Sequence, residues 1–274
     1  MMTIGSDPEV FILNSNNQLV SSEDLIGGTK LEPRNLGYGI FIQEDNVAVE
    51  YNIPPCSTAD ELVSNIKLGL SKVQQELDKY GYKVAIMASG IFEPEYIYTT
   101  HGLTMGCEPD YSIYTGTTNP LTNPDTSLRS CGGHIHIGYD FKALTKNQRK
   151  ISNANIVRAM DLFLCVPSML LDSDTRRREL YGKPGSFRPK PYGLEYRSLS
   201  NFWIASDELI RWVWDQTVLA FEFSKIESNM DSIIHDEHLI LKAINENDSL
   251  LIDNLCKKYG IHIPVHIHAT QEVV

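Results

Sequence analysis

The chain has 274 residues, 42% of them hydrophobic and 22% charged, and 35 acidic residues against 24 Lys and Arg give a formal net charge of −11. This length and composition are typical of a globular protein with one large domain or two small ones. The acidic balance gives the chain no general affinity for nucleic acid or an anionic membrane, so neither partner is expected.

The cysteines and the N-terminal stretch indicate the compartment. The five cysteines (Cys56, Cys107, Cys131, Cys165 and Cys256) are scattered and include no CxxC pair. This pattern argues against a disulfide framework and favours a reducing compartment. The opening MMTIGSDPEVFIL lacks a basic region followed by an apolar run, and no stretch has the uninterrupted apolar length of a membrane span. We therefore expect a cytoplasmic location.

Three strands and a helix are predicted in the first third of the chain. TIGSDPEVFIL (3–13), VAVEYNIPP (47–55) and KVAIMASGIF (83–92) are predicted strands, rich in branched and aromatic residues. Thr58 and Glu61 form a capping box, and the apolar stripe from Leu62 to Leu77 predicts a helix that Gly81 ends.

The remaining chain alternates loops, strands and helices. Two loops are predicted, a long functional loop over residues 92–130 and a basic loop over residues 175–193. Strands are predicted at 131–140 (CGGHIHIGYD) and 194–202 (LEYRSLSNF), and two helices over residues 206–258. Thr145 and Gln148 cap a further helix that Pro167 is expected to disturb. No linker divides the sequence, so we predict a single α+β domain over residues 1–274, with a mostly antiparallel sheet and a helical C-terminal part from about residue 206.

Four of the strand segments carry polar residues in an i, i+2 pattern, which places both side chains of a pair on one side of a strand. The pairs are Asp7 with Glu9, Glu50 with Asn52, His134 with His136, and Glu195 with Arg197. The residues between them are mainly apolar, and none of the eight is Lys, Ser or Thr, which are common on a solvated face. One sheet with an apolar face and a shared functional polar face is therefore predicted.

The charges on this face indicate a metal and phosphate site. Clustered carboxylates raise each other's pKa unless a cation intervenes, and hard cations such as Mg²⁺ take carboxylate oxygens, waters and phosphates. Arginine holds phosphate oxygens in a planar, bidentate grip. The segment 176–197 concentrates basic residues: Arg176, Arg177, Arg178, Lys183, Arg188, Lys190 and Arg197. GxxxxGK[ST] and GxGxxG are both missing from the sequence, so a nucleotide site here is neither a P-loop nor a Rossmann site.

The motifs GSDPEVF, DNVAVEYNIPP, LRSCGGHIHIG and RRELYGKPGSFRPKPYGLEYRSLSNFW, in this order, resemble the phage-type carboxylate–amine ligases, or amidoligases (COOH–NH2 ligases of type 2). These are distant relatives of glutamate–cysteine ligase and glutamine synthetase, and the resemblance runs from about Gly5 to Trp203. It implies a bent, glutamine synthetase-like sheet with helices on its convex face and ATP with Mg²⁺ (or Mn²⁺) on its concave face. It also implies that ATP phosphorylates a carboxylate and that an amine displaces phosphate from the acyl phosphate, forming an amide or peptide bond.

The resemblance also implies roles for individual residues, by position. The implied metal ligands are Glu9, Glu50, Glu195 and His134; the implied catalytic residues are Arg197, Arg188 and Glu195; and the implied ATP-binding residues are Arg178, Arg188, Arg197, His134, His136 and Arg129. The expected partners are small-molecule or peptide carboxylates and amines, and a homo-oligomer is compatible with this family. If a phage encodes the chain, the expected location is the cytoplasm of a bacterial host.

Two other functions remain open from the sequence. A zinc-dependent hydrolase would use His134 and His136 with Glu50 or Glu195 as third ligand, because zinc sites favour histidine with one carboxylate. That hypothesis leaves the basic segment without a role. A non-catalytic phage interaction protein that retains the fold is the other alternative, since fold alone does not determine function.

Overall fold

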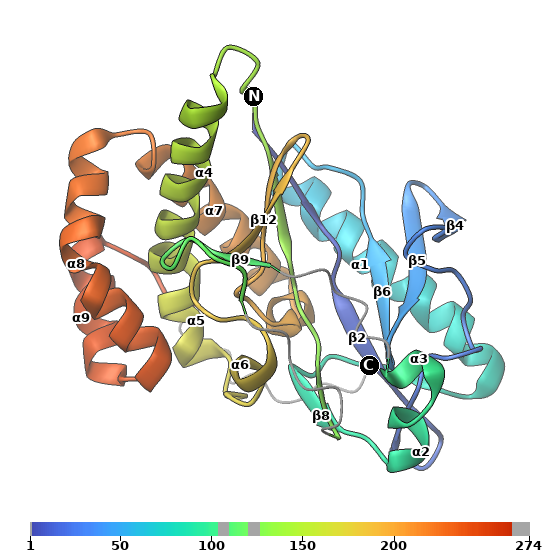
Figure 1. Cartoon of the computed structure of the whole chain (residues 1–274). Coiled ribbons are helices and arrows are strands. Elements are labelled where there is room, and N and C mark those ends of the chain that lie inside the picture. The colour runs from blue at the N-terminus through green and yellow to red at the C-terminus, as the bar shows by residue number, and fades with distance from the viewer. Residues whose placement is uncertain (1, 104–109, 120–126, 265–274) are drawn as a thin grey trace.

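The computed structural model describes residues 2–103, 110–119 and 127–264, and combines helices with curled antiparallel sheets (Figure 1). One sheet has the order β1 (Thr3–Ser6), β11 (Ile135–Gly138), β13 (Gly193–Tyr196), β12 (Ser186–Lys190), β9 (Tyr111–Ser112). The other has the order β3 (Leu19–Val20), β2 (Glu9–Leu13), β6 (Ala48–Asn52), β5 (Ile40–Asp45), β4 (Arg34–Gly37), with β7 (Lys83–Ala85) also paired to β2. A separate pair consists of β8 (Ser89–Ile91) and β10 (Leu128–Ser130). The predicted α+β class with antiparallel strands is confirmed.

The first predicted strand is divided at Asp7–Pro8, so that β1 and β2 belong to different sheets. Proline fixes its φ angle and lacks the N–H that a ladder requires. The chain at and after the end of β6 bonds to both parts: Tyr51 N–H donates to the Pro8 carbonyl and Ile53 N–H to the Ser6 carbonyl, each at 3.1 Å. The expected single sheet is therefore two sheets that meet at this bend.

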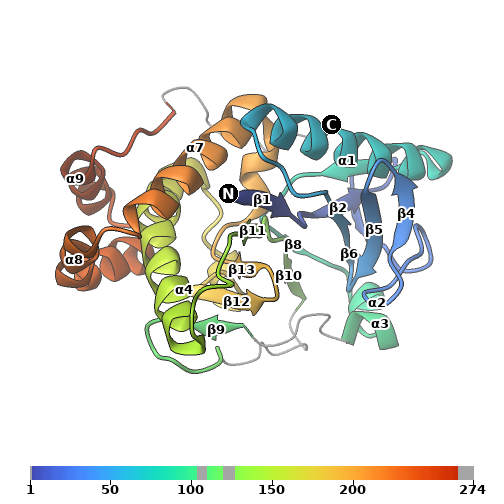
Figure 2. The ribbon, with the colours of Figure 1, turned by 90° about the horizontal axis from the view of Figure 1, so that it is seen from above.

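Helix α1 (Ala59–Leu77) begins where the sequence predicts, with the Thr58 side chain accepting from Glu61 N–H, and it covers one face of β6 and β5 (Figure 2). Its contact with the sheet depends on Gly69. A Cβ at this position would lie 2.4 Å from the ring of Tyr51, which is fully buried. The missing side chain therefore lets the helix approach the sheet closely.

Helix α4 (Lys146–Met160) has the predicted Thr145–Gln148 capping box and continues through a π-helical turn (Asp161–Cys165) into α5 (Val166–Leu171). The expected disturbance therefore comes just before Pro167, as a π-helical turn. By length and composition the composite helix Lys146–Leu171 could span a membrane, although charged residues interrupt its apolar sequence, and 78% of its most apolar stretch is buried inside the fold. Its apolar side chains form part of the core against the five-stranded sheet and α7 (Asp207–Phe223).

The predicted pair of C-terminal helices is three helices. After α7 come α8 (Glu227–Glu246) and α9 (Ser249–Tyr259), and Asn247, with a φ of 52°, ends α8. Helices α8 and α9 form an outer layer on α5 and α4 (Figure 1). Short helical segments complete the described chain: Asp78–Tyr80, α2 (Pro94–Ile97), α3 (Thr100–Leu103), α6 (Arg177–Leu180) and Asn201–Ala205. The predicted loop 92–130 thus contains α2, α3, β9 and β10, and its residues 104–109 and 120–126 lie outside the described part of the chain. The predicted loop 175–193 contains α6 and β12.

Candidate active site

A cavity of about 480 Å³ lies between the two sheets, with both acidic and basic walls. It is lined by Asp7, Lys30, Pro33, Phe41, Gln43, Asp45, Glu50, Asn52, His136, Arg188, Lys190, Tyr192 and Arg197. The residues that alternate with these on β11 and β13, among them Ile135, Ile137 and Leu194, are fully buried in the core on the other side. The strands thus present a polar side to the cavity and an apolar side to the helices.

The acidic wall is a group of three carboxylates on β2, β5 and β6, of which Asp45 and Glu50 line the cavity and Glu9 lies behind them. Oxygens of Glu9, Asp45 and Glu50 lie within 4.8 Å of one another, and Glu9 and Glu50 stand directly opposite in the β2–β6 register. Burial and the nearby Asp45 raise the pKa of Glu9 to about 7. Burial, Asp7, Asp45 and Glu9 raise the pKa of Glu50 well above its ordinary value. The group therefore concentrates three carboxylates in a small space, and burial and their mutual repulsion raise the pKa values of Glu9 and Glu50.

Asp7 joins this group to the histidines. Its Oδ1 lies 3.2 Å from Nδ1 of His134, and its Oδ2 lies 3.1 Å from Nε2 of His136. Burial alone would raise the pKa of Asp7, but the charge of His136 and the hydrogen bond with His134 hold it well below its usual range. Burial and Arg197 lower the pKa of His134 to about 4, which leaves this imidazole neutral at neutral pH. His136 Nδ1 also lies 2.8 Å from the hydroxyl of Tyr192, whose ring stacks on the imidazole.

The basic wall surrounds Glu195 on β13. This carboxylate forms a hydrogen-bonded ion pair with Arg197, and it lies 2.6 Å from Lys190 Nζ and 3.6 Å from an Nη of Arg188. Although burial and Asp7 raise it, Arg197 and the histidines lower the pKa of Glu195 to about 2. Asp110, which the sequence pattern did not indicate, lies 3.9 Å from Nε of Arg197. Glu195 is therefore ionised and surrounded by cations, whereas the pKa values of Glu9 and Glu50 are raised.

The Gly132–Gly133 pair explains how His134 and Glu9 reach the site. The Gly132 N–H donates to Oε2 of Glu9 at 2.6 Å, and a Cβ on Gly132 would lie 2.3 Å from Nε2 of His134. A Cβ on Gly133 would lie 2.3 Å from Nε1 of Trp203, whose indole N–H donates to the Gly133 carbonyl. Glycine at position 132 therefore lets the histidine ring lie against the backbone beside the carboxylate, and glycine at position 133 lets the indole of Trp203 approach.

Three arginines lie differently from what the sequence indicates. Arg177 is buried and donates to the backbone carbonyls of Cys131, Ser198 and Arg197, so it holds together the chain segments before His134 and after Glu195. Arg178 lines a different cavity, between α6 and the end of α8. Arg129 is buried and donates to the Asn46 side chain and the Gly102 carbonyl. Neither Arg178 nor Arg129 lines the cavity described above, and the roles predicted for them stay predictions.

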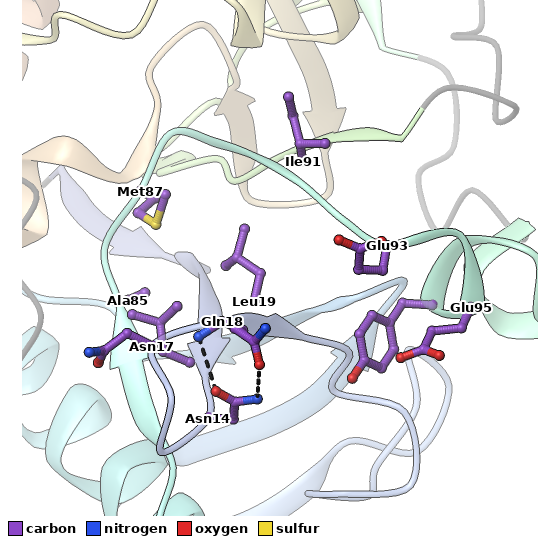
Figure 3. Close-up of a pocket in the computed structure, with 11 residues that line it drawn as sticks. Asn14, Asn17, Gln18, Leu19, Ala85, Met87, Ile91, Glu93 and Glu95 are labelled. Atoms are coloured by element: carbon purple, nitrogen blue, oxygen red, sulfur yellow. Dashed lines mark hydrogen bonds between the residues drawn. The ribbon is translucent and has the colours of Figure 1, made fainter.

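Another hollow, of about 490 Å³, lies at the far end of β2 and contains none of the predicted site residues (Figure 3). Its floor includes Asn14 and Gln18, whose side-chain amides bond to each other at 3.2 Å, while Gln18 N–H donates to Asn14 at 3.0 Å. Because these polar groups are partnered within the loop, they stabilise the turn between β2 and β3.

Residues 125–258 match the model of a family described as "Phage phiEco32-like COOH.NH2 ligase-type 2". This is the family that the motifs predicted. The matched range contains the strands that carry His136, Arg188 and Glu195, and it extends into the C-terminal helices, where the sequence showed no recognisable motif. No curated protein matches the chain. A solved structure described as a bifunctional glutathione synthetase from Pasteurella multocida is similar at 8% identity with a TM-score of 0.44. The similarity covers 94% of this chain and 49% of that chain, so the present chain spans about half the length of the synthetase.

Proposed function

We propose that the chain is an ATP-dependent carboxylate–amine ligase that works with Mg²⁺ or Mn²⁺ as one catalytic domain with a glutamine synthetase-like core. A carboxylate would take the γ-phosphoryl group of ATP, releasing ADP. An amine would then attack the acyl phosphate, lose a proton and release phosphate, leaving an amide or peptide bond. The observation that supports this proposal is one cavity in which a cluster of carboxylates faces a row of cations.

The acidic wall suits a hard cation. Glu9, Asp45 and Glu50 offer three carboxylate oxygens, the ligand type that Mg²⁺ prefers, and burial together with the neighbouring carboxylates raises the pKa values of Glu9 and Glu50. Side-chain amides of Gln43 and Asn52 donate to Oε1 of Glu50 at 3.0 and 3.4 Å and orient it. When bound there, the metal would neutralise charge on the ATP phosphates.

The basic wall suits phosphate oxygens. Arg188, Lys190 and Arg197 converge on Glu195, which orients them and keeps them from repelling one another. We propose that they stabilise the negative charge of the transferring phosphoryl group, a task in which fixed cations supply most of the catalytic effect. Glu195 and His134, implied as metal ligands by the family resemblance, are better suited to positioning in this arrangement, because Glu195 is already balanced by cations.

The zinc hydrolase is less well supported. Among residues 2–103, 110–119 and 127–264, the groups of side chains that converge closely enough to hold a metal contain one histidine at most, in Asp7–His136–Glu195. His134 and His136 are held apart by Asp7, which contacts each ring with a different oxygen. A zinc site built on both rings would require this arrangement to break.

Calorimetry of ATP binding with and without Mg²⁺ tests the proposal. We expect Mg²⁺-dependent binding that Glu50→Gln abolishes and Arg188→Gln weakens, while Glu208→Gln, on the exposed start of α7, leaves it unchanged. Hydroxylamine added with ATP and candidate carboxylic acids should yield a hydroxamate if an acyl phosphate forms. ATP binding that ignores both Mg²⁺ and Glu50→Gln would refute the assignment of the acidic wall.

A further inference from the structure

A cavity of about 720 Å³ lies between α4 and the β9–β12 edge of the five-stranded sheet. Strand β12 separates it from the candidate active site. Arg188 faces the first cavity, whereas Phe187 and Pro189, which alternate with it, line this one, and Lys190 borders both. The volume is within the range of small-molecule sites.

The wall that α4 contributes is cationic where a core helix is normally apolar. Lys146, Arg149, Lys150 and Asn153 line the cavity with i, i+3, i+4 and i+7 spacing, so they form one stripe of the helix. Further along the same stripe, Ile156, Val157 and Met160 are buried in the core. The stripe thus changes from apolar to basic where it reaches the cavity.

These cations are not balanced by nearby acids. Within the described part of the chain, no carboxylate forms an ion pair with Lys146, Arg149 or Lys150, and the first turn of α4 contains no acidic residue. A helix N-terminus ordinarily favours acidic residues because its dipole is positive there. In a protein with a net charge of −11, this is a local positive field with room for an anion.

The opposite wall is aromatic and apolar. The rings of Tyr111 and Phe187 lie with centroids 6.3 Å apart, beside Pro189. Asn153 is only 4% exposed, and its side-chain carbonyl accepts a hydrogen bond from the Tyr139 hydroxyl at 2.5 Å. The side-chain NH₂ group of Asn153 is then left as a donor. A flat apolar body would pack on the rings while an anionic group meets the lysines.

We propose that this cavity binds a small organic anion, a phosphate or carboxylate carried on an aromatic or heterocyclic ring. The binding does not depend on the proposed ligase activity. It would place the ligand against the face of β12 opposite Arg188, with the anion near Lys146 and Lys150 and the ring near Phe187.

Calorimetry without ATP or Mg²⁺ tests this site with 2-naphthyl phosphate, 2-naphthoate, inorganic phosphate and 2-naphthol as probes. We expect at least one of the two ring-bearing anions, 2-naphthyl phosphate and 2-naphthoate, to bind. Inorganic phosphate and 2-naphthol should bind much more weakly. The comparison of 2-naphthyl phosphate with 2-naphthoate identifies the preferred anionic group. Replacing both Lys146 and Lys150 by Gln should raise the Kd about tenfold or more. Both lysines are exposed, so the variant should fold normally.

Two matched controls keep the result specific. Replacing Lys67 and Lys72 of α1 by Gln removes the same charge elsewhere, and Arg188→Gln alters the first cavity; both should keep the affinity. Loss of binding in Arg188→Gln but not in the α4 double variant would place the probe in the first cavity and overturn the inference. Equal binding of naphthol, or no binding of either ring-bearing anion, would overturn it as well.

Discussion

Replacing Glu9 by Gln should stabilise the metal-free protein at alkaline pH. This carboxylate is buried opposite Glu50 and beside Asp45, and the effect of burial and Asp45 on its pKa outweighs the attraction of Arg197 and Arg177. Gln has nearly the same shape and retains an oxygen to accept the Gly132 N–H. The substitution therefore removes the charge and keeps the hydrogen bond.

The magnitude follows from the pKa of Glu9, which is raised from its ordinary value of 4.5 to about 7. Between these values the folded protein keeps a proton that the unfolded chain has lost, so the free energy of unfolding falls as pH rises. At roughly 1.4 kcal/mol per pH unit, the total cost above the folded pKa is about 3 kcal/mol. Glu9→Gln should therefore raise the free energy of unfolding by this amount at about pH 8 and by almost nothing at about pH 4.

Urea unfolding in the presence of a chelator measures the effect, and Glu195→Gln provides a control of opposite sign. Arg197 and the histidines, against the effects of burial and Asp7, lower the pKa of Glu195 from 4.5 to about 2, so its ionised form stabilises the fold above pH 4.5. Glu195→Gln should therefore lower the free energy of unfolding by up to about 3 kcal/mol at about pH 8, and by less as the pH falls. If Glu9→Gln destabilises at both pH values, the acidic wall is not under electrostatic strain and the argument for a metal there fails.

Three further substitutions have defined outcomes. Gly69→Ala should lower the free energy of unfolding by about 1–3 kcal/mol, because its Cβ would meet Tyr51 2.4 Å away; an unchanged urea midpoint would contradict this. Gly132→Ala should displace the His134 ring and weaken Mg²⁺-dependent ATP binding in calorimetry, whereas unchanged affinity would speak against it. Cys131→Ala should retain ADP release, because burial raises the thiol pKa well above its ordinary value; complete loss would require a covalent role.

The alternation of polar and apolar residues was sufficient to predict which side chains share a face. His134 and His136 both contact Asp7, while Ile135 and Ile137 are in the core, as the period of two requires. Local capping signals likewise gave the starts of α1 and α4. These features depend on neighbours in the sequence, so they can be inferred from it.

Features that depend on pairing between distant segments could not be inferred. Asp45 ends β5, a strand that is not predicted from the sequence. It reaches the acidic wall because β5 pairs with β6, where Gln43 stands opposite Glu50. Arg177 belongs to a run of three arginines, and only its burial against three backbone carbonyls distinguishes it from its neighbours. No local signal separates such a structural arginine from a phosphate ligand.

Glu9 and Glu195 show why site roles require the strand register. The same i, i+2 pattern suggests a metal ligand in both cases. In the structure Glu9 stands opposite another glutamate, whereas Glu195 stands between Arg188 and His136 on its two neighbouring strands. Their pKa values consequently move in opposite directions, to about 7 and about 2. A cation would relieve the first environment, whereas three basic side chains already surround Glu195, and this difference is why we propose the metal at the wall of Glu9 and the phosphate at the wall of Glu195.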